Sequence, residues 1–284
     1  MKFRTEIEPV KPSHLISMRQ PILMLGSCFT DNIGERLGRD GFDVVHNPLG
    51  PLYNPISIAN CIMRAFDGKA YTENDLVQGP NGYHCLDYAS RYSGQDATAV
   101  AAKVNADFST VCERLADPKL QTVIITFGSA FVYERQGKAV GNCHKFPASD
   151  FRRRRLGIKE IVDAWAPVIG RLPDQANIIF TVSPIRHLAD GLHGNEVSKA
   201  TLLLALEELY PAYPMRAGYF PSYEIMIDDL RDYRFYAADM KHPSEVAVDY
   251  IYEIFCNTYA TPETLREAAE NRRRYRASLH RPIL

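Results

Sequence analysis

Short apolar runs alternate with longer amphipathic segments along most of the 284-residue chain. The runs at 22–25, 123–127 and 177–182 are rich in β-branched residues and stop at Gly or Ser, which is typical of buried strands. Two further runs, 42–46 and 223–226, also predict strands. Apolar residues at helical spacing predict the helices, which cover 31–38, 56–66, 97–116, 158–169, 196–209 and 244–259. Strands and helices that take turns indicate a mostly parallel sheet covered on both faces.

Three segments depart from this alternation. Residues 70–95 have no clear period, and we expect an irregular surface insertion there. A polar segment runs from 128 to 155. The chain from 261 onward predicts a charged helix with Thr261 as its N-cap and Pro262 at its first position. We therefore expect one α/β domain over 1–260 and a helical tail over 261–284, whose basic cluster at 272–276 is a solvated face or an oligomer contact.

Composition narrows the class of protein. The chain is 46% hydrophobic and 24% charged, with a net charge of −1, so it can bury a large core and lacks the basic footprint of a dedicated nucleic-acid binder. The exception is the arginine run at 152–155, which indicates a solvated face or helix start, with a phosphate site as the alternative. Six cysteines without metal-ligand spacing predict mostly buried thiols.

The chain also lacks two features of exported or membrane-bound proteins. Its first residues are charged and do not contain the apolar core of a secretory signal, and no stretch approaches the roughly 18 apolar residues of a membrane span. We expect a cytoplasmic protein without a membrane span. A sequence from which a leader had been removed would have the same pattern.

Two motifs near opposite ends carry the candidate chemistry. Gly26-Ser27-Cys28-Phe29 follows the first predicted strand, and Asp239-Met240-Lys241-His242-Pro243 lies near the end of the domain. A serine at the tip of a strand and a histidine with a carboxylate three residues earlier are the parts of a hydroxyl nucleophile and its base. In parallel sheets the active crevice lies beyond the carboxyl ends of the strands, where Ser27 falls. Cys28 is the rival nucleophile, but we expect its side chain to point into the core.

Five ordered blocks resemble the GSCFA family, a branch similar to the SGNH/GDSL hydrolases. Beside Gly26-Ser27-Cys28-Phe29 they are Asn47-Pro48-Leu49-Gly50, Thr126-Phe127-Gly128, Asn142-Cys143-His144-Lys145, Thr181-Val182-Ser183-Pro184-Ile185-Arg186-His187 and the late Asp-x-x-His motif. The motif at Gly26-Ser27-Cys28-Phe29 departs from the family at the next position, which is Thr30 in this chain and alanine in relatives. The blocks cover most of the chain.

The resemblance implies a flavodoxin-like three-layer α/β/α sandwich with a mostly parallel sheet. It also implies a serine esterase without a cofactor, in which Ser27 attacks a small acyl ester, His242 moves the proton and Asp239 orients the imidazole. By the same resemblance, the ester is an O-acetyl group on a carbohydrate. Two alternatives stay open, namely acyl transfer to a hydroxyl acceptor and a non-catalytic binding module that retains the fold.

The oxyanion site departs from the wider SGNH pattern. That superfamily has Gly-x-Asn-Asp after its third strand, whereas this chain has Gly128-Ser129-Ala130-Phe131 and lacks the asparagine. The backbone amides of Ser27 and Gly50 are the candidate donors, with the side chain of Asn142 as a replacement. The alternative for Asn142 is an Asn that caps a turn.

A second polar group in the sequence is formed by His144, Lys145, Arg186 and His187. The two histidines lack the spacing of a helical metal pair, so we expect no catalytic metal. His144, Arg186 and His187 are candidates for holding a carbonyl, hydroxyl or anionic group of the substrate. We expect structural roles for the remaining histidines, which are His14, His46, His84, His193 and His280.

Overall fold

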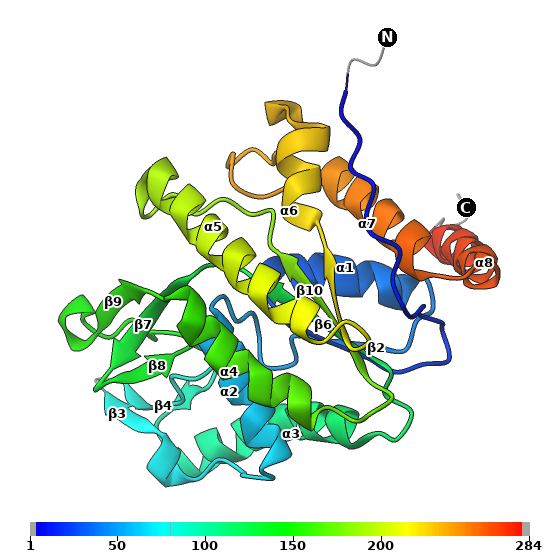
Figure 1. Ribbon diagram of the computed structural model, residues 1–284. Helices are drawn as coiled ribbons and strands as arrows, with labels where there is room; N and C mark the ends of the chain where they lie inside the picture. Colours follow the sequence, from blue (N-terminus) through cyan, green and yellow to red (C-terminus); the bar gives the residue numbers. More distant parts are fainter. Residues whose placement is uncertain (1–3, 80, 280–284) are drawn as a thin grey trace, which may run out of the picture.

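A five-stranded parallel sheet forms the centre of the protein (Figure 1). The structure is a computed structural model and describes residues 4–79 and 81–279. The sheet has the order β11-β10-β6-β1-β2, and each neighbouring pair is parallel. Its strands are β1 (Ile22–Gly26), β2 (Val44–His46), β6 (Thr122–Phe127), β10 (Asn177–Val182) and β11 (Ala217–Phe220). In chain order this is the 2-1-3-4-5 arrangement of flavodoxin-like folds, which confirms the predicted fold class.

Helices cover both faces of this sheet and make the three layers visible in Figure 1. One face packs against α2 (Pro55–Phe66), α3 (Ala97–Ala116), α4 (Ile158–Arg171) and α5 (Gly191–Leu209), and the other packs against α1 (Cys28–Arg39), α7 (Glu245–Tyr259) and α8 (Pro262–Leu279). Side chains alternate along each strand, so Leu23 and Leu25 join the first core while Ile22 and Met24 join the second. Both cores are apolar, as the sequence pattern predicts.

Two small antiparallel sheets are added to the central one. The first contains β3 (Val77–Gly79), β4 (Gly82–His84) and β5 (Ser93–Gly94), and the second contains β7 (Phe131–Arg135), β8 (Lys138–Val140) and β9 (Arg152–Arg155). Short 3₁₀ segments lie at η1 (Glu73–Asp75), η2 (Ala148–Asp150), η3 (Tyr210–Ala212) and η5 (Tyr233–Phe235). The prediction of an irregular 70–95 segment is therefore wrong, because strands of two or three residues are too short to show a period.

One local prediction in the C-terminal half is also wrong. Residues 223–226 are helical, since α6 (Ser222–Glu224) continues into a π-helical turn, η4 (Ile225–Leu230), and the last strand is β11 just before. Helix α7 begins close to its predicted start. The Ser244 side chain caps that helix by accepting the Ala247 N–H at 3.3 Å, so α7 begins at Glu245.

The arginine run at 152–155 forms strand β9 and not a helix start. Arg154 pairs with Glu134 at 2.6 Å and with Glu160 at 2.5 Å. Arg153 pairs with Asp190, and its guanidinium lies 4.2 Å from the centre of the Phe131 ring. These ion pairs compensate the charge of two of the four arginines.

The C-terminal helix α8 is tied to the body of the domain. Thr261 accepts the Thr264 N–H at 3.1 Å, which confirms the predicted N-cap. Arg272 forms an ion pair with the fully buried Asp40, the C-cap of α1, and Asp40 also accepts the Tyr252 hydroxyl of α7 at 2.8 Å. The prediction of a wholly solvated basic cluster is therefore wrong for Arg272. His280 and the rest of the predicted tail beyond 279 lie outside the described residues.

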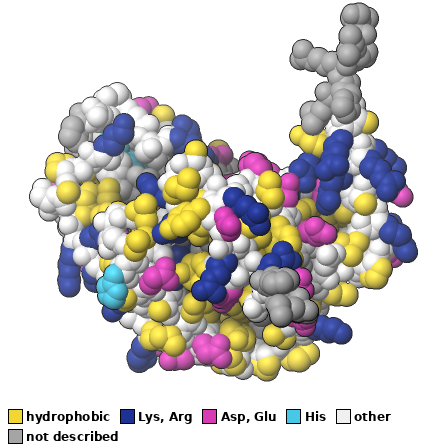
Figure 2. Space-filling view, turned by 90° about the horizontal axis from the view of Figure 1, so that it is seen from above, with side chains coloured by type: hydrophobic (Ala, Val, Ile, Leu, Met, Phe, Trp, Pro, Cys, Tyr) yellow, Lys and Arg dark blue, Asp and Glu magenta, His cyan; other side chains and the backbone are white. Residues whose placement is uncertain are grey.

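The surface carries both signs of charge. Figure 2 shows Lys and Arg side chains interspersed with Asp and Glu over the face seen from above. In the described ranges, 4–79 and 81–279, no helix is both long and apolar enough to cross a membrane.

Candidate active site

Ser27 lies in a tight turn between β1 and α1. Gly26 has φ +149°, and a Cβ there would lie 2.3 Å from the carbonyl oxygen of Thr126, so only glycine fits. The Ser27 N–H donates to the same Thr126 oxygen at 3.2 Å. Because β1 and β6 flank the point where the strand order reverses, this turn sits at the topological switch point where doubly wound folds bind ligands.

Asn47 fixes the turn from the neighbouring strand end. Its Oδ1 accepts the Gly26 N–H at 2.9 Å, and its Nδ2 donates to the Ser27 carbonyl at 3.2 Å. Asn47 is itself buried and has a positive φ of 38°, a conformation that Asn tolerates better than most residues. Asn47 therefore bonds to the backbone on both sides of the Gly26–Ser27 peptide.

The Ser27 hydroxyl is enclosed. The residue is only 1% exposed, and its Oγ caps α1 by accepting the Phe29 N–H at 3.3 Å. A Cβ at Gly128 would lie 3.2 Å from Ser27 Cβ and the same distance from the Tyr53 ring, so Gly128 and Tyr53 lie over the turn. The hydroxyl is positioned at the switch point but does not face open solvent.

Cys28 is half-buried and contacts the apolar core between the sheet and α1. Burial, together with the Asp31 carboxylate, raises the pKa of its thiol. A raised pKa keeps the group in its weakly nucleophilic neutral form, which disfavours Cys28 as the rival nucleophile.

Asp239 and His242 form a compact pair on the loop before α7. Asp239 Oδ2 lies 2.5 Å from His242 Nδ1, and Oδ1 accepts the N–H groups of Lys241 at 2.9 Å and His242 at 3.0 Å. These bonds, that from the His242 N–H first, hold the pKa of Asp239 well below its usual range. With Nδ1 bonded to a carboxylate, the proton of a neutral imidazole sits on Nδ1, so Nε2 has the lone pair that a general base needs.

A series of contacts joins this loop to the carboxyl edge of the sheet. The Arg186 N–H donates to the Lys241 carbonyl at 3.1 Å, and its Nη1 donates to the Met240 carbonyl at 3.2 Å. The next residue, His187, donates through Nε2 to the Gly128 carbonyl at 2.9 Å. Since Gly128 lies against Ser27, the two motifs that are far apart in sequence connect to the same edge of the sheet. No described hydrogen bond in 4–79 and 81–279 joins Ser27 to His242 directly.

Arg186 and His187 thus bind the protein's own backbone. Arg186 also lies near the rings of Tyr233 and Tyr236, at 5.9 and 5.4 Å from their centres, and these contacts hold the 231–244 loop. Burial, and then the Lys199 ammonium, lower the pKa of His187 to about 4. His187 is consequently neutral near pH 7, with its Nε2 proton committed to Gly128.

Asn142 and His144 lie in the loop that follows β8. His144 is buried, its Nε2 bonds to the Tyr88 carbonyl at 2.8 Å, and its ring packs edge-on against His84. Asn142 Oδ1 accepts the His144 N–H at 2.9 Å, which is the turn-capping alternative for this residue. The exposed Nδ2 of Asn142 is the part of this pair that a ligand can reach.

The predicted oxyanion amides are both engaged. The Ser27 N–H donates to Thr126, and the Gly50 N–H donates to the Asn47 carbonyl at 2.8 Å within a tight turn. The Gly128 and Ser129 amides both donate to the Tyr53 carbonyl. In contrast, the Cys28 N–H is the first amide of α1, a position without an intrahelical acceptor. It follows the serine directly, as oxyanion donors often do.

The family model for the GSCFA family matches residues 21–255, which span the sheet and both motifs. The chain belongs to the GSCFA family. A solved structure of a carbohydrate esterase family 2 enzyme with a carbohydrate-binding domain, from Corynascus thermopiles (Myceliophthora fergusii), matches this GSCFA chain with 11% identity and a TM-score of 0.44. That match covers 86% of this chain and 66% of the other. No curated protein matches the sequence.

Lys199 is a residue of the GSCFA site that the sequence analysis misses. Its side chain is buried, and Nζ donates to the Gly128 carbonyl at 2.8 Å and to the Ser183 carbonyl at 2.7 Å. It therefore joins the ends of β6 and β10 beside the serine. Burial lowers the pKa of its ammonium to about 7. Its position in the sequence could have indicated this role. Lys199 precedes Leu202 by three residues and Leu206 by seven, which places it on the apolar face of the helix.

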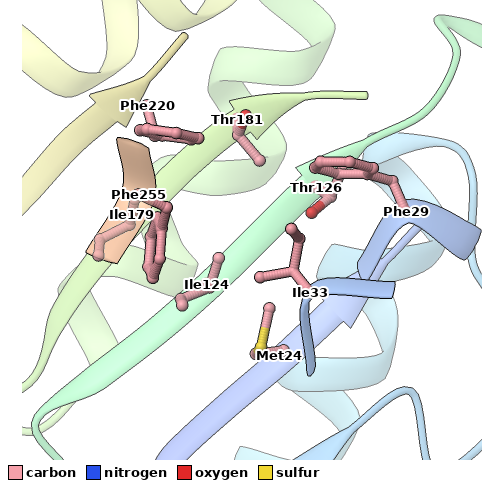
Figure 3. A pocket seen from close by; sticks show the side chains of 9 residues that line it. All are labelled: Met24, Phe29, Ile33, Ile124, Thr126, Ile179, Thr181, Phe220 and Phe255. Atoms are coloured by element: carbon pink, nitrogen blue, oxygen red, sulfur yellow. The ribbon is translucent and has the colours of Figure 1, made fainter. Parts of the chain in front are cut away.

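An apolar cavity lies under the switch point, between the sheet and helices α1 and α7 (Figure 3). It is lined by Met24, Phe29, Ile33, Ile124, Thr126, Ile179, Thr181, Phe220 and Phe255. Its volume of about 10 Å³ is roughly that needed for one water molecule, so this space is part of the GSCFA core and not a substrate site. Among the residues that the structure describes, no group of three or more His, Cys, Asp or Glu side chains is arranged to hold a metal ion.

Proposed function

We propose that this GSCFA protein is a serine hydrolase that cleaves a small acyl ester. The observation that carries the proposal is the Asp239–His242 pair, with Nδ1 and Oδ2 2.5 Å apart, on a loop bonded to the same sheet edge that presents Ser27. Carboxylate, imidazole and serine hydroxyl are the three groups of a Ser-His-Asp mechanism. The family blocks at both motifs support the same assignment of roles.

In the proposed reaction, His242 Nε2 takes the proton of the Ser27 hydroxyl as Oγ attacks the ester carbonyl. The oxyanion is stabilised by the Cys28 N–H and by the positive end of α1. Collapse expels the alcohol, which receives the proton from His242, and leaves an acyl-Ser27 ester. Water, activated by the same imidazole, then releases the acid and regenerates the hydroxyl.

Burial of Ser27 sets a condition on this mechanism. A serine that is 1% exposed offers an ester no direct approach, so the Tyr53 and Gly128 side of the turn must move for substrate to reach Oγ and for His242 to engage it. The natural ester is an O-acetyl group on a carbohydrate in this proposal. A carbohydrate hydroxyl in place of water would make the protein an acyltransferase, which product analysis with an acetyl donor and a glycan acceptor separates from hydrolysis.

The same burial, together with the engaged Ser27 and Gly50 amides, favours one alternative of another class, a binding module without catalysis. The test is Ser27→Ala. We expect it to abolish turnover of a short aryl acetate and labelling by a fluorophosphonate, while loss of the helix cap lowers stability by only about 1 kcal/mol. A wild-type chain that neither turns over the ester nor reacts with the fluorophosphonate would support the binding module. Undiminished activity of Ser27→Ala would overturn the nucleophile assignment.

A further inference from the structure

A large polar cavity outside the Ser27 turn has no part in the proposed catalysis. Its volume is about 840 Å³, within the range of about 300–1,000 Å³ that small-molecule sites occupy. Helix α2, the segment 69–78, the segment 86–88 and the β7–β8 hairpin bound it. Neither the Ser27 turn nor the Asp239–His242 loop contributes a described residue to its lining.

Asp87 is a fixed carboxylate on the wall of this cavity. Its Oδ2 accepts the Tyr71 hydroxyl at 3.0 Å, and that hydroxyl lies 2.9 Å from the hydroxyl of the buried Tyr88. Water reaches the Asp87 side chain, yet surrounding protein raises the pKa of its carboxyl by desolvation. Both properties hold for a group that projects into a deep recess. The backbone behind it is closely packed, because a side chain at Gly141 would collide with the Asp87 carbonyl.

Most of the other charges that line the cavity are already compensated. Arg64 pairs with Asp75 at 3.0 Å and its guanidinium lies 3.7 Å from the centre of the Tyr71 ring, while Lys69 pairs with Asp67 at 3.0 Å. Besides Asp87, the remaining charged groups of the lining are Arg135 and Lys138. This near balance gives a strongly charged ligand little net attraction.

Neutral groups complete the lining. The amide side chains of Asn60, Asn74 and Gln78 are exposed to the cavity and have no hydrogen-bond partner within the described ranges. Each amide both donates and accepts hydrogen bonds, and apolar atoms of Ile56 and Val77 lie among them. Sugars match this mixture, since their hydroxyls also donate and accept while their C–H faces are apolar.

We propose that this cavity binds a neutral carbohydrate, with the Asp87 carboxylate accepting bonds from two sugar hydroxyls and the Asn60 and Gln78 amides bonding to others. The site does not depend on catalysis at Ser27. It would bind the glycan at a place separate from the site where the catalytic residues attack the acyl group.

Saturation-transfer NMR on the full chain tests this site, with cellobiose, xylobiose and maltose as separate probes. The Ser27→Ala variant serves as the background, so the outcome is independent of any esterase activity. We expect transfer to at least one disaccharide, and affinity about tenfold weaker in Asp87→Asn, which loses a charged acceptor. The matched control is Asp150→Asn, an exposed aspartate outside the cavity, which should bind as the parent does.

Gln78→Ala and Asn60→Ala provide a second test on exposed side chains, and each should weaken binding even if Asp87→Asn unfolds. Three results would overturn the proposal. They are absence of transfer to all three sugars, equal binding in the parent and every lining variant, and binding of inorganic phosphate or citrate in the cavity without any sugar.

Discussion

The Ser27 turn and the Asp239–His242 loop are built in opposite ways. Ser27 is 1% exposed, and its turn is held by Asn47, by Thr126 and by a glycine that no other residue can replace. The side chains of Asp239 and His242 are 44% and 47% exposed, and their bonds are mostly to each other. Substitutions in the loop should therefore remove activity without loss of stability, whereas those around the turn should lower both.

The largest expected effect is on activity, at His242. We expect His242→Ala to lower kcat/KM for an aryl acetate by about 10⁴-fold or more, because the serine loses its base. Its free energy of unfolding should stay within about 0.5 kcal/mol of the parent, since the side chain is half-exposed. His193→Ala, at an exposed histidine of α5, is the control and should keep full activity. Wild-type turnover in His242→Ala would assign the base elsewhere.

The largest expected effect on stability is at Gly26. Gly26→Ala places a Cβ 2.3 Å from the Thr126 oxygen at φ +149°, so we expect a loss of about 3 kcal/mol or more in the free energy of unfolding, measured with urea. Gly38→Ala in α1 is the matched control. Its Cβ would meet only Val44 at 3.6 Å, and alanine should stabilise the helix by up to about 1 kcal/mol. Equal effects of the two substitutions would contradict the tight turn.

Asn47 should give an intermediate loss. Asn47→Ala removes the hydrogen bonds to the Gly26 N–H and the Ser27 carbonyl in a buried site, and we expect it to cost about 2 kcal/mol of unfolding free energy. Activity should fall as well, because the serine is no longer fixed. Asn47→Asp keeps the acceptor for Gly26 but places a carboxylate oxygen against the Ser27 carbonyl in a buried site, so it should be at least as destabilising as the alanine variant. An alanine variant as stable as the parent would show that the turn does not need the Asn47 hydrogen bonds.

The smallest effect is a pH dependence set by His187. Its pKa is lowered to about 4 in the folded chain, against about 6.5 when unfolded, so the unfolded chain binds the extra proton between these values. The stability from this group is complete above pH 6.5 and is lost as the pH falls toward 4. His187→Gln should therefore lose less stability between pH 6.5 and 4.5 than the parent does, measured by thermal unfolding. His193→Gln, at an exposed ring, should follow the parent curve.

The sequence predicts the parts of the fold whose pattern is local. β10 and the helix at 97–116 have the predicted bounds, because a long β-branched run indicates a strand and a long helical spacing of apolar residues indicates a helix. Strand β11, Ala217–Phe220, has small and aromatic residues without alternation, while the apolar run after it is a buried helical turn. Competing local signals of this kind favoured the wrong element.

The candidate site likewise contains some contacts that the sequence predicts and others that it does not. The Asp239–His242 contact follows from a three-residue spacing, and Gly26 follows from its position before a strand-end serine. The contacts of Asn47 with Gly26 and of Lys199 with Gly128 join residues 21 and 71 positions apart. Such contacts depend on how strands and helices pack, which a single sequence does not encode in any readable spacing.

The buried carboxylate of Asp40 determines where the chain can be shortened. Helix α8 supplies the Arg272 cation that compensates it, and Asn271 donates to the Asp40 carbonyl at 3.0 Å. A protein cut after residue 260 would retain the buried carboxylate but lose one of its two cationic partners, leaving only Arg39 at 3.3 Å, so we expect it to be less stable. Helix α8 is thus part of the domain. Truncation before it would remove side chains that stabilise the C-terminal end of α1.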